Sequence, residues 1–457
     1  MANLSHMEND QSSLQALVKA IKLSQGQFRL ILVRCNYGEL RERIIQQLRQ
    51  QSPIEIQELV LPKTVKSLYA KIQEKVRDGQ TQALMVSGLE SALDLDTVLT
   101  SSNNLREAFN RNFPFPLLVW VNNDLLRKFY RLIPDFTNWS TTTEFTLTPN
   151  ELVKLLQRKD QQLFDINSTV NPDDGAELEA ARQDLIESGV GLLPNLEASL
   201  EFGLGLCALE NNQIDNALAH YQKSFSFWQQ THNFERQAIL RLNIARCYER
   251  KAEQNRAEKA FSLKEASYEL QQCLNLFKKA QRPDLVAKHI GKHGEVLRRL
   301  QDWDNLEYLA KEALTLHQNS RYSRQLAQDY GFLAEVALNK KRWKEANQFA
   351  EKAMLSKDIK PQELALYQLL LANSQAHLGE VDKAVSNLED AKKKSKPQSN
   401  PQLYIEILEK LRSLCFEQGE YRKAFQIKQE KLTLEHQYGF RAFIGASALP
   451  CLVENKG

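Results

Sequence analysis

The sequence predicts an α/β N-terminal domain, built mainly on a parallel sheet, followed by an all-α solenoid of repeated helical hairpins. Two observations predict this fold class. Up to about residue 150, short apolar runs alternate with helix-like segments, as in a parallel sheet that is covered on both faces. From about residue 174 onward no strand pattern is visible, and amphipathic helical patterns recur at intervals of about 40 residues.

The elements of the first half can be placed from these runs. Strands are predicted at residues 28–35, 54–61, 82–86, 114–122 and 141–148, with helices near 38–50, 63–77, 93–110 and 123–132. The polar, turn-rich stretch 165–175 contains Pro172 and is the best linker candidate. We therefore divide the chain into a sheet domain (1–160), a linker and capping helix (161–190), a solenoid of about six repeats (191–437) and a C-terminal tail (438–457).

The repeats are recognised by a small or apolar anchor residue in the second helix of each hairpin. Two antiparallel helices approach closely only where small side chains cross, and larger residues fill the seam beside them. A larger apolar residue precedes most anchors by three positions, at Ile214, Trp303, Trp343, Val381 and Tyr421. The anchors are Ala217, Ala266, Leu306, Ala346, Ala384 and Ala424, at spacings of 49, 40, 40, 38 and 40 residues.

This pattern resembles the tetratricopeptide repeat. Gly379 and Gly419 occupy the turn position between the two helices, and Tyr421 occupies the aromatic position after it. Ala346, Ala350 and Ala353 match the three small positions of the second helix. The period is nearer 40 than the usual ~34 residues, which implies longer helices or loops. The resemblance implies stacked hairpins whose concave face binds a partner segment.

The first strand and the helix after it lie where a P-loop NTPase carries its phosphate-binding motif. That motif needs glycines, a Lys and a Ser or Thr, so that backbone N–H groups and a cation surround the phosphates. The sequence offers RCNYGELRER instead, with one glycine (Gly38), the anion-repelling Glu39, and no Lys-Ser or Lys-Thr pair. We therefore expect no catalytic, cofactor-binding or metal-ligating residues and no enzymatic activity.

Even so, residues 20–150 resemble the degenerate P-loop NTPase-like (STAND or AAA-like) module that precedes tetratricopeptide repeats in multidomain bacterial signalling proteins. The resemblance depends on LILVRCNYGELRERI, on ALMVSGLES and most specifically on Leu117–Trp139. The resemblance implies a domain fold inherited from regulatory proteins, without catalytic activity in this chain. The segment Tyr438–Ala446 resembles a junction to a further NTPase domain, which fits either a short paralogue or a piece of a longer chain.

Composition and cysteine usage bear on the ligand classes and on the cellular compartment. The chain has 60 basic and 57 acidic residues, a net charge of +3, which argues against nucleic acid and acidic membranes as ligands. Six cysteines without a CxxC pair indicate a reducing compartment. Neither a secretory signal nor a membrane-length apolar run is visible, so we expect a cytoplasmic protein. His289 and His293 share a helix face, but without a third ligand they are interpreted as packing residues.

The leading hypothesis is an interaction scaffold, with no membrane partner. Two alternatives stay open: an ATP- or GTP-dependent switch, and a nucleic-acid effector that uses the lysines of residues 392–396. Self-association is also open. The helical register places a stripe of both charge signs and several amides on the concave face, which predicts a mixed polar ligand. This stripe consists of Arg246, Lys288, Arg298, Gln328, Glu335, Asn339, Asn373, His377 and Glu409.

Overall fold

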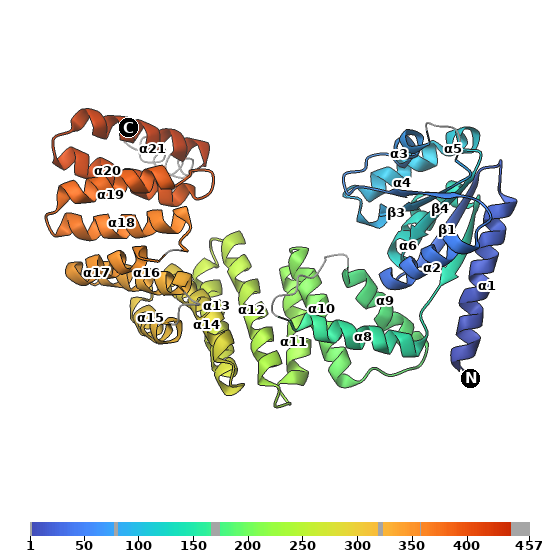
Figure 1. The fold of residues 1–457 in the computed structure, drawn as a ribbon, viewed down its shortest axis with the longest axis horizontal. Coiled ribbons are helices and arrows are strands. Elements are labelled where there is room, and N and C mark those ends of the chain that lie inside the picture. Colours follow the sequence, from blue (N-terminus) through green and yellow to red (C-terminus); the bar gives the residue numbers. More distant parts are fainter. Residues whose placement is uncertain (1, 77–80, 166–173, 319–322, 357, 440–457) are drawn as a thin grey trace, which may run out of the picture. The chain divides into compact units, whose positions relative to one another are not determined.

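The computed structural model describes residues 2–76, 81–165, 174–318, 323–356 and 358–439, and it divides into two compact units, Met1–His232 and Asn233–Gly457. The first unit holds a parallel sheet with the strand order β2-β3-β4-β1-β5 (Figure 1). The parallel sheet that the alternating pattern predicts is thereby confirmed. Its strands are β1 (Arg29–Cys35), β2 (Ile56–Val60), β3 (Ala83–Ser87), β4 (Pro116–Val121) and β5 (Ser140–Phe145).

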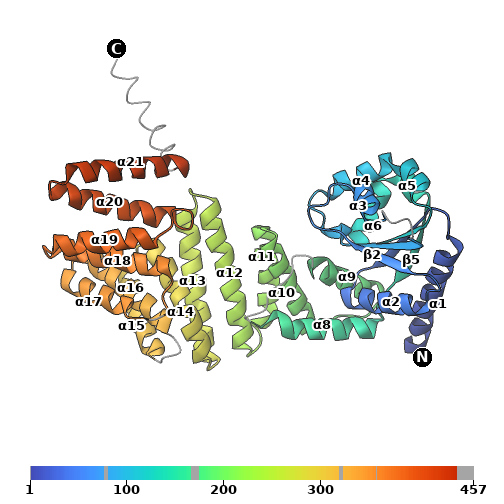
Figure 2. The ribbon, with the colours of Figure 1, turned by 45° about the horizontal axis from the view of Figure 1, so that its top comes forward.

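Helices cover both faces of the sheet, as the strand sequences require. Successive residues of β1 enter opposite cores: Leu30 and Leu32 join one cluster, while Ile31 and Val33 join the other. Figure 2 shows the sheet between these layers. One layer has α1 (Ala2–Leu23), α2 (Gly38–Gln51), α8 (Pro149–Leu163) and α9 (Asp174–Glu187); the other has α3 (Leu68–Lys75), α4 (Leu95–Asn104), α5 (Arg106–Asn112), α6 (Asn123–Leu132) and α7 (Pro134–Thr137).

Some boundaries of this unit differ from the sequence prediction. The helix expected at 63–77 begins at Leu68, because the Ser67 hydroxyl accepts a hydrogen bond from the Ala70 amide and caps it. The helix expected at 93–110 is two helices, α4 and α5, separated at Leu105. Helix α1 was not predicted, although its buried residues Leu14, Leu17 and Ile21 have helical spacing. Residues 166–173 of the predicted linker lie outside the described residues.

Within the described residues, twelve further helices pair as helical hairpins, and we call the first helix of each pair helix A and the second helix B. The hairpin α10/α11 groups with the sheet in the first unit, and the other five form the second unit. The all-α repeat half of the fold class is confirmed, while the domain boundaries stay a prediction. The helices are α10 (Pro194–Glu210), α11 (Ile214–Trp228), α12 (Phe234–Gln254), α13 (Lys259–Lys279), α14 (Pro283–Leu300), α15 (Trp303–His317), α16 (Ser323–Asn339), α17 (Trp343–Met354), α18 (Pro361–His377), α19 (Val381–Lys394), α20 (Pro401–Glu417) and α21 (Tyr421–Gln437).

The anchor residues lie where the two helices of each hairpin meet. Ala217, Ala266, Leu306, Ala346 and Ala384 are each 0% exposed, and Ala424 is 5% exposed. The larger residue three positions earlier is in each case the first residue of helix B. The turn before this residue contains a residue with a left-handed backbone conformation. At Gly379 and Gly419 this conformation causes no strain, because glycine has no Cβ. Other hairpins place Asn212, Gln301 and Lys341 there.

One seam residue behaves differently. Tyr421 was expected to fill the seam beside Ala424, but its side chain is 63% exposed, so this prediction is wrong. The ring contacts Phe416 at a centroid distance of 5.2 Å. The equivalent Trp343 is half-buried because His377, in the next helix A, stacks on it. The described residues contain no helix after α21 that could cover Tyr421 in this way, and residues 440–457 of the predicted tail lie outside them.

Candidate functional site

The helices A of the second unit line a cavity of about 510 Å³. It lies along α14, α16 and α18, and we call it the A-helix groove. Buried or half-buried apolar side chains form its floor, and polar and charged side chains surround them. The floor consists of Phe332, Leu366, Tyr367 and Leu370; the polar lining consists of Lys288, Lys292, Glu295, Arg298, Arg324, Gln325, Gln328, Glu335 and Glu363.

Glycines bring the three helices of this groove together. A Cβ added to Gly294 on α14 would lie 2.6 Å from the Phe332 ring on α16. A Cβ added to Gly331 on α16 would lie 2.5 Å from the Tyr367 ring on α18. Each aromatic ring therefore packs directly against the backbone of the preceding helix A, and the polar residues beside these contacts face one shared groove.

Arg298 is the centre of the charged network in the groove. Its guanidinium donates to Glu295 at 2.6 Å and lies 3.6 Å from a carboxylate oxygen of Glu335. Burial raises the pKa of Glu335 and the charge of Arg298 lowers it, while the negative charges of Glu295 and Glu406 raise it further. Arg298 thus pairs with two carboxylates, and a third, that of Glu406, lies close enough to add to their repulsion.

The opposite end of the groove carries cations. Lys288 and Lys292 are one helical turn apart on α14, and both side chains are exposed. The surrounding groove still reduces the hydration of Lys292. This desolvation, followed by repulsion from Arg246 and Lys288, lowers the pKa of Lys292. The groove therefore has a basic end on α14, while Glu295 and Glu335 lie around Arg298.

Of the predicted stripe, four residues line the groove: Lys288, Arg298, Gln328 and Glu335. The other five do not line this cavity. Arg246 is exposed on α12 and donates to Asn243; Asn339 is exposed at the end of α16 and donates to the Glu335 carbonyl; Asn373 is half-buried on α18; His377 stacks on Trp343 with a centroid distance of 3.9 Å; and Glu409 accepts from Arg412 and Lys431.

The residues that sequence reasoning missed are Lys292, Glu295, Arg324, Gln325, Glu363 and the apolar floor. Lys292 follows Lys288 by four positions, so its place on the same face was visible in the sequence. Arg324 and Glu363 form an ion pair between α16 and α18, and such a pair depends on packing between helices that the sequence does not specify.

The two histidines considered as metal ligands are packing residues. His289 stacks on Phe277 with a centroid distance of 5.8 Å, and the His293 Nε2 atom lies 3.0 Å from the Ser267 hydroxyl. Burial lowers the pKa of His289 to about 3 and that of His293 to about 4, so both rings stay neutral at physiological pH. No group of three potential metal ligands occurs among the described residues.

A second cavity, of about 920 Å³, lies in the first unit at the carboxyl edge of the sheet. It includes Asn36 and Gly38 after β1, Ser87 at the end of β3 and Asn122 after β4, which is where open parallel sheets bind ligands. Seven carboxylates line it, against Arg41, Lys128 and His220. They belong to Glu42, Glu58, Glu90, Asp124, Asp174, Glu177 and Glu179.

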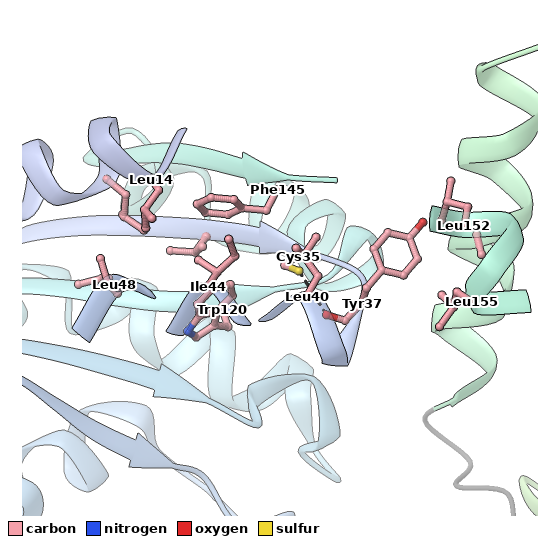
Figure 3. Packing of buried hydrophobic residues seen from close by; sticks show 14 of the residues in the cluster. Leu14, Cys35, Tyr37, Leu40, Ile44, Leu48, Trp120, Phe145, Leu152 and Leu155 are labelled. Atoms are coloured by element: carbon pink, nitrogen blue, oxygen red, sulfur yellow. Dashed lines mark hydrogen bonds between the residues drawn. The ribbon is translucent and has the colours of Figure 1, made fainter. Parts of the chain in front are cut away.

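The connection between β1 and α2 is too short to surround a phosphate. It consists of Asn36 and Tyr37 alone, because β1 ends at Cys35 and α2 begins at Gly38. Tyr37 is 1% exposed. Figure 3 shows its ring beside Leu152 and Leu155 of α8. The loop backbone therefore offers no run of free N–H groups, and a buried aromatic residue occupies the loop.

Comparison with known proteins gives few matches in sequence. No family model matches this chain. An uncharacterised WD repeat-containing protein of Synechocystis sp. is 24% identical over 190 residues, which cover 36% of this chain and 11% of that protein. The chain thus spans about a tenth of the length of this curated relative. In the part of the chain that the structure describes, no helix is long and apolar enough to cross a membrane.

Similar solved structures include the apo form of RapI, with a TM-score of 0.48 and 12% identity over 66% of this chain and 89% of that chain. The pilF protein of Pseudomonas aeruginosa has a TM-score of 0.37 and 15% identity over 54% and 94%. BtubC from P. vanneervenii has a TM-score of 0.38 and 14% identity over 55% and 91%. The paired helices and buried anchors of this chain itself define its tetratricopeptide-like repeats.

Proposed function

We propose that this protein is a non-catalytic adaptor of bacterial signalling or regulation whose A-helix groove binds a segment of a partner protein. The observation that carries the proposal is the groove itself, in which exposed and half-buried polar side chains of α14, α16 and α18 surround an apolar floor. Stacked hairpins commonly bind an extended or helical segment on such a surface. Arg246, Asn339, Asn373, His377 and Glu409 are proposed to extend the contact along the neighbouring helices.

The charges of the groove indicate the chemistry of the partner. The lysine end fits acidic side chains, and the carboxylates around Arg298 fit a basic one, while the floor accepts an apolar side chain. A segment that carries both charge signs around an apolar residue therefore fits better than a purely acidic one.

Peptide selection against the full chain tests this proposal. Binding peptides are chosen from a displayed library, and their affinities are then measured by fluorescence anisotropy. Exchanging the two charges, Arg298→Glu with Glu335→Arg, keeps an opposite pair in place but inverts the surface, so we expect affinity to fall about tenfold or more without loss of helicity. Lys344→Glu, on the exposed side of α17, is the matched control and should leave affinity unchanged. Equal affinities for all three proteins would contradict the groove as binding site.

We further propose that the sheet domain is a degenerate P-loop NTPase-like module that has lost its reaction. In support, the order in which strands are added to the sheet reverses at β1, since β4 pairs with one edge of β1 and β5 with the other. The two-residue connection, the buried Tyr37 and the acidic cavity all oppose phosphate binding. These observations disfavour the alternative of an ATP- or GTP-dependent switch.

The second alternative, a nucleic-acid effector, depends on the lysines near the end of α19. Lys392 pairs with Glu430 at 2.6 Å, and Lys393 pairs with Asp390 at 3.3 Å. Each of these carboxylates competes with a phosphate for its lysine, so this run is a weak polyanion site. Steeply salt-dependent binding of the full chain to DNA or RNA would favour the alternative.

We expect no nucleotide hydrolysis by the full chain. Without a phosphate-binding loop and its lysine, the charge of a transferred phosphoryl group has no compensation. Release of phosphate from ATP or GTP with Mg²⁺ should equal the rate in buffer alone. Turnover that survives repurification and is lost in Arg41→Ala, at the cavity wall, would contradict the expectation.

A further inference from the structure

We propose that residues 440–457 turn back along α21 and cover the open face of this helix, which is the last described helix of the stack (Figure 1). The inference concerns the second unit alone, to which these residues belong. It goes beyond the adaptor function and does not depend on the A-helix groove. The observations that carry it are the exposed side chains of α21 and the apolar sequence that directly follows this helix.

The open face of α21 is a stripe of residues that we call the end stripe. These residues follow one another at spacings of four, three and four positions, so they lie on one side of the helix. The end stripe consists of Tyr421, Phe425, Lys428 and Leu432. Tyr421 and Phe425 are 63% and 58% exposed. Phe416 of α20, which contacts the Tyr421 ring, is 62% exposed and extends the apolar surface.

The same stripe is covered in earlier hairpins, because the next hairpin lies against it. In α17, the His377 ring of the next helix A stacks on Trp343, with a centroid distance of 3.9 Å. The Ser374 hydroxyl of the same helix A donates to Asn347 at 3.3 Å. The equivalent positions, all buried or half-buried, are Trp303, Glu307, Ala310 and Leu314 in α15, Trp343, Asn347, Ala350 and Met354 in α17, and Val381, Val385, Leu388 and Lys392 in α19.

The residue types of the end stripe indicate that α21 is not the outer end of the fold. Terminal hairpins of repeat proteins present a polar outer face, since no further repeat covers them. Helix α21 presents aromatic rings instead, as a helix B does when another helix lies against it. Adjacent exposed apolar side chains of this kind are typical of a contact surface.

The chain after α21 has the length and the composition to cover this surface. Gly439 has a φ of 71°, a left-handed conformation that ends helices and redirects the chain. Residues 440–457 read FRAFIGASALPCLVENKG, and residues 442–453 among them contain no charged side chain. The 17 residues of α21 extend about 25 Å, and the following 18 residues would extend about 27 Å even as a helix. The segment can therefore lie antiparallel along the whole end stripe.

A second copy of the chain fits this face less well than the segment 440–457. Arg422 and Lys428 are exposed on α21, and Lys428 lies within the end stripe. Two copies that met through this face would bring like charges together, which opposes association. The uncharged stretch 442–453 brings no such charge to the aromatic rings.

Cysteine trapping in the full chain tests the proposal, with the native Cys451 as the reporter. A segment that turns back at Gly439 places Cys451 opposite position 428, because both positions are about equally far from the turn. We compare Lys428→Cys with the matched control Gln426→Cys, which is also exposed on α21 but lies on another side of the helix. The other cysteines of the described structure are buried. A disulfide requires two Cα atoms within about 7 Å, so it reports contact.

With diamide as the oxidant, the disulfide between positions 428 and 451 should form at least about tenfold faster than the one between 426 and 451. Peptide mapping without reduction identifies each disulfide, and a non-reducing gel separates bonds within one chain from bonds between chains. Phe425→Ser, added to Lys428→Cys, should lower the rate to that of the control, because it removes an aromatic ring from the end stripe. Tyr421→Ser repeats this test at the other exposed ring, and circular dichroism checks that each variant is folded.

Three results would overturn the proposal. Equal rates at positions 428 and 426, or no disulfide at 428, would show that the segment does not lie on the end stripe. A disulfide-linked dimer as the main product would make a second copy the occupant. A rate that neither serine variant changes would show that the aromatic rings do not hold the segment. None of these measurements uses a partner peptide, so failure of the groove proposal is a separate result.

Discussion

Replacing His317 with alanine is expected to destabilise the second unit by about 3–5 kcal/mol, because it leaves a buried carboxylate without its partner. His317 ends α15, and its Nδ1 atom lies 2.6 Å from an Asp329 carboxylate oxygen on α16. Both side chains are 1% exposed. The His317 Nε2 atom lies 2.8 Å from the Ala287 carbonyl oxygen of α14. One imidazole therefore connects three successive helices.

The hydrogen-bond pattern defines the charge of this imidazole. A carbonyl oxygen can only accept, so Nε2 carries a proton, and a carboxylate at Nδ1 is best matched by a second proton there. Burial alone would lower the pKa of His317, but the hydrogen bond and charge of Asp329, together with the Ala287 carbonyl, outweigh it and raise the pKa. The pair is thus expected to hold a proton that an unfolded histidine would release.

Stability should therefore depend on pH in a defined direction. A histidine with a raised pKa contributes fully below the unfolded value of about 6.5, and its contribution is lost as pH rises through the folded value. We expect unfolding free energies of the wild type to decline above pH ~6.5. The slope should be shallower in His317→Ala, because the titrating group is absent.

Urea denaturation at several pH values measures both effects. His436→Ala, at an exposed histidine of α21, is the matched control and should change stability by less than about 0.5 kcal/mol. Asp329→Asn keeps the hydrogen bond without the charge, so it should cost less than His317→Ala while flattening the same slope. A His317→Ala protein as stable as the His436→Ala protein would contradict the role assigned to the pair.

Ala346→Leu is the second large expected effect. Ala346, Ala350 and Ala353 are all 0% exposed on α17, at the face that packs in its hairpin. Three added heavy atoms have no space there, and overpacking costs about 1–3 kcal/mol. Lys344→Leu, at an exposed position of the same helix, should remain within about 0.5 kcal/mol of the wild type. Equal denaturation midpoints for both variants would show that the repeat register is wrong.

The fold could be predicted where a local period determines it. The continuous apolar run of β1 and the recurrence of anchors such as Ala217 and Ala384 are properties of single elements, and the sequence shows them directly. Tyr421 was misjudged because its exposure depends on the next helix rather than on its own hairpin. Helix α1 was missed because its first residues are polar and its apolar stripe is narrow.

The candidate site was predictable only in part for the same reason. Helical register places Lys288, Gln328 and Glu335 on the inner face of their helices, and they line the groove. His377 and Glu409 share that register, yet His377 stacks on Trp343 and Glu409 pairs with Lys431, both on helices B. These contacts arise from the long side chains of neighbouring helices, which no single-helix pattern specifies.

Site-specific photo-crosslinking tests whether the A-helix groove binds a partner segment. A photoreactive amino acid replaces Lys288 in the groove or Tyr308, which is 73% exposed on helix B of the same hairpin. The selected binding peptide is irradiated with each full-length protein, and the adducts are mapped by mass spectrometry. We expect adducts at position 288 that disappear in the Arg298→Glu, Glu335→Arg protein, and none at position 308. Adducts at position 308 alone, or equally at both positions, would contradict this expectation.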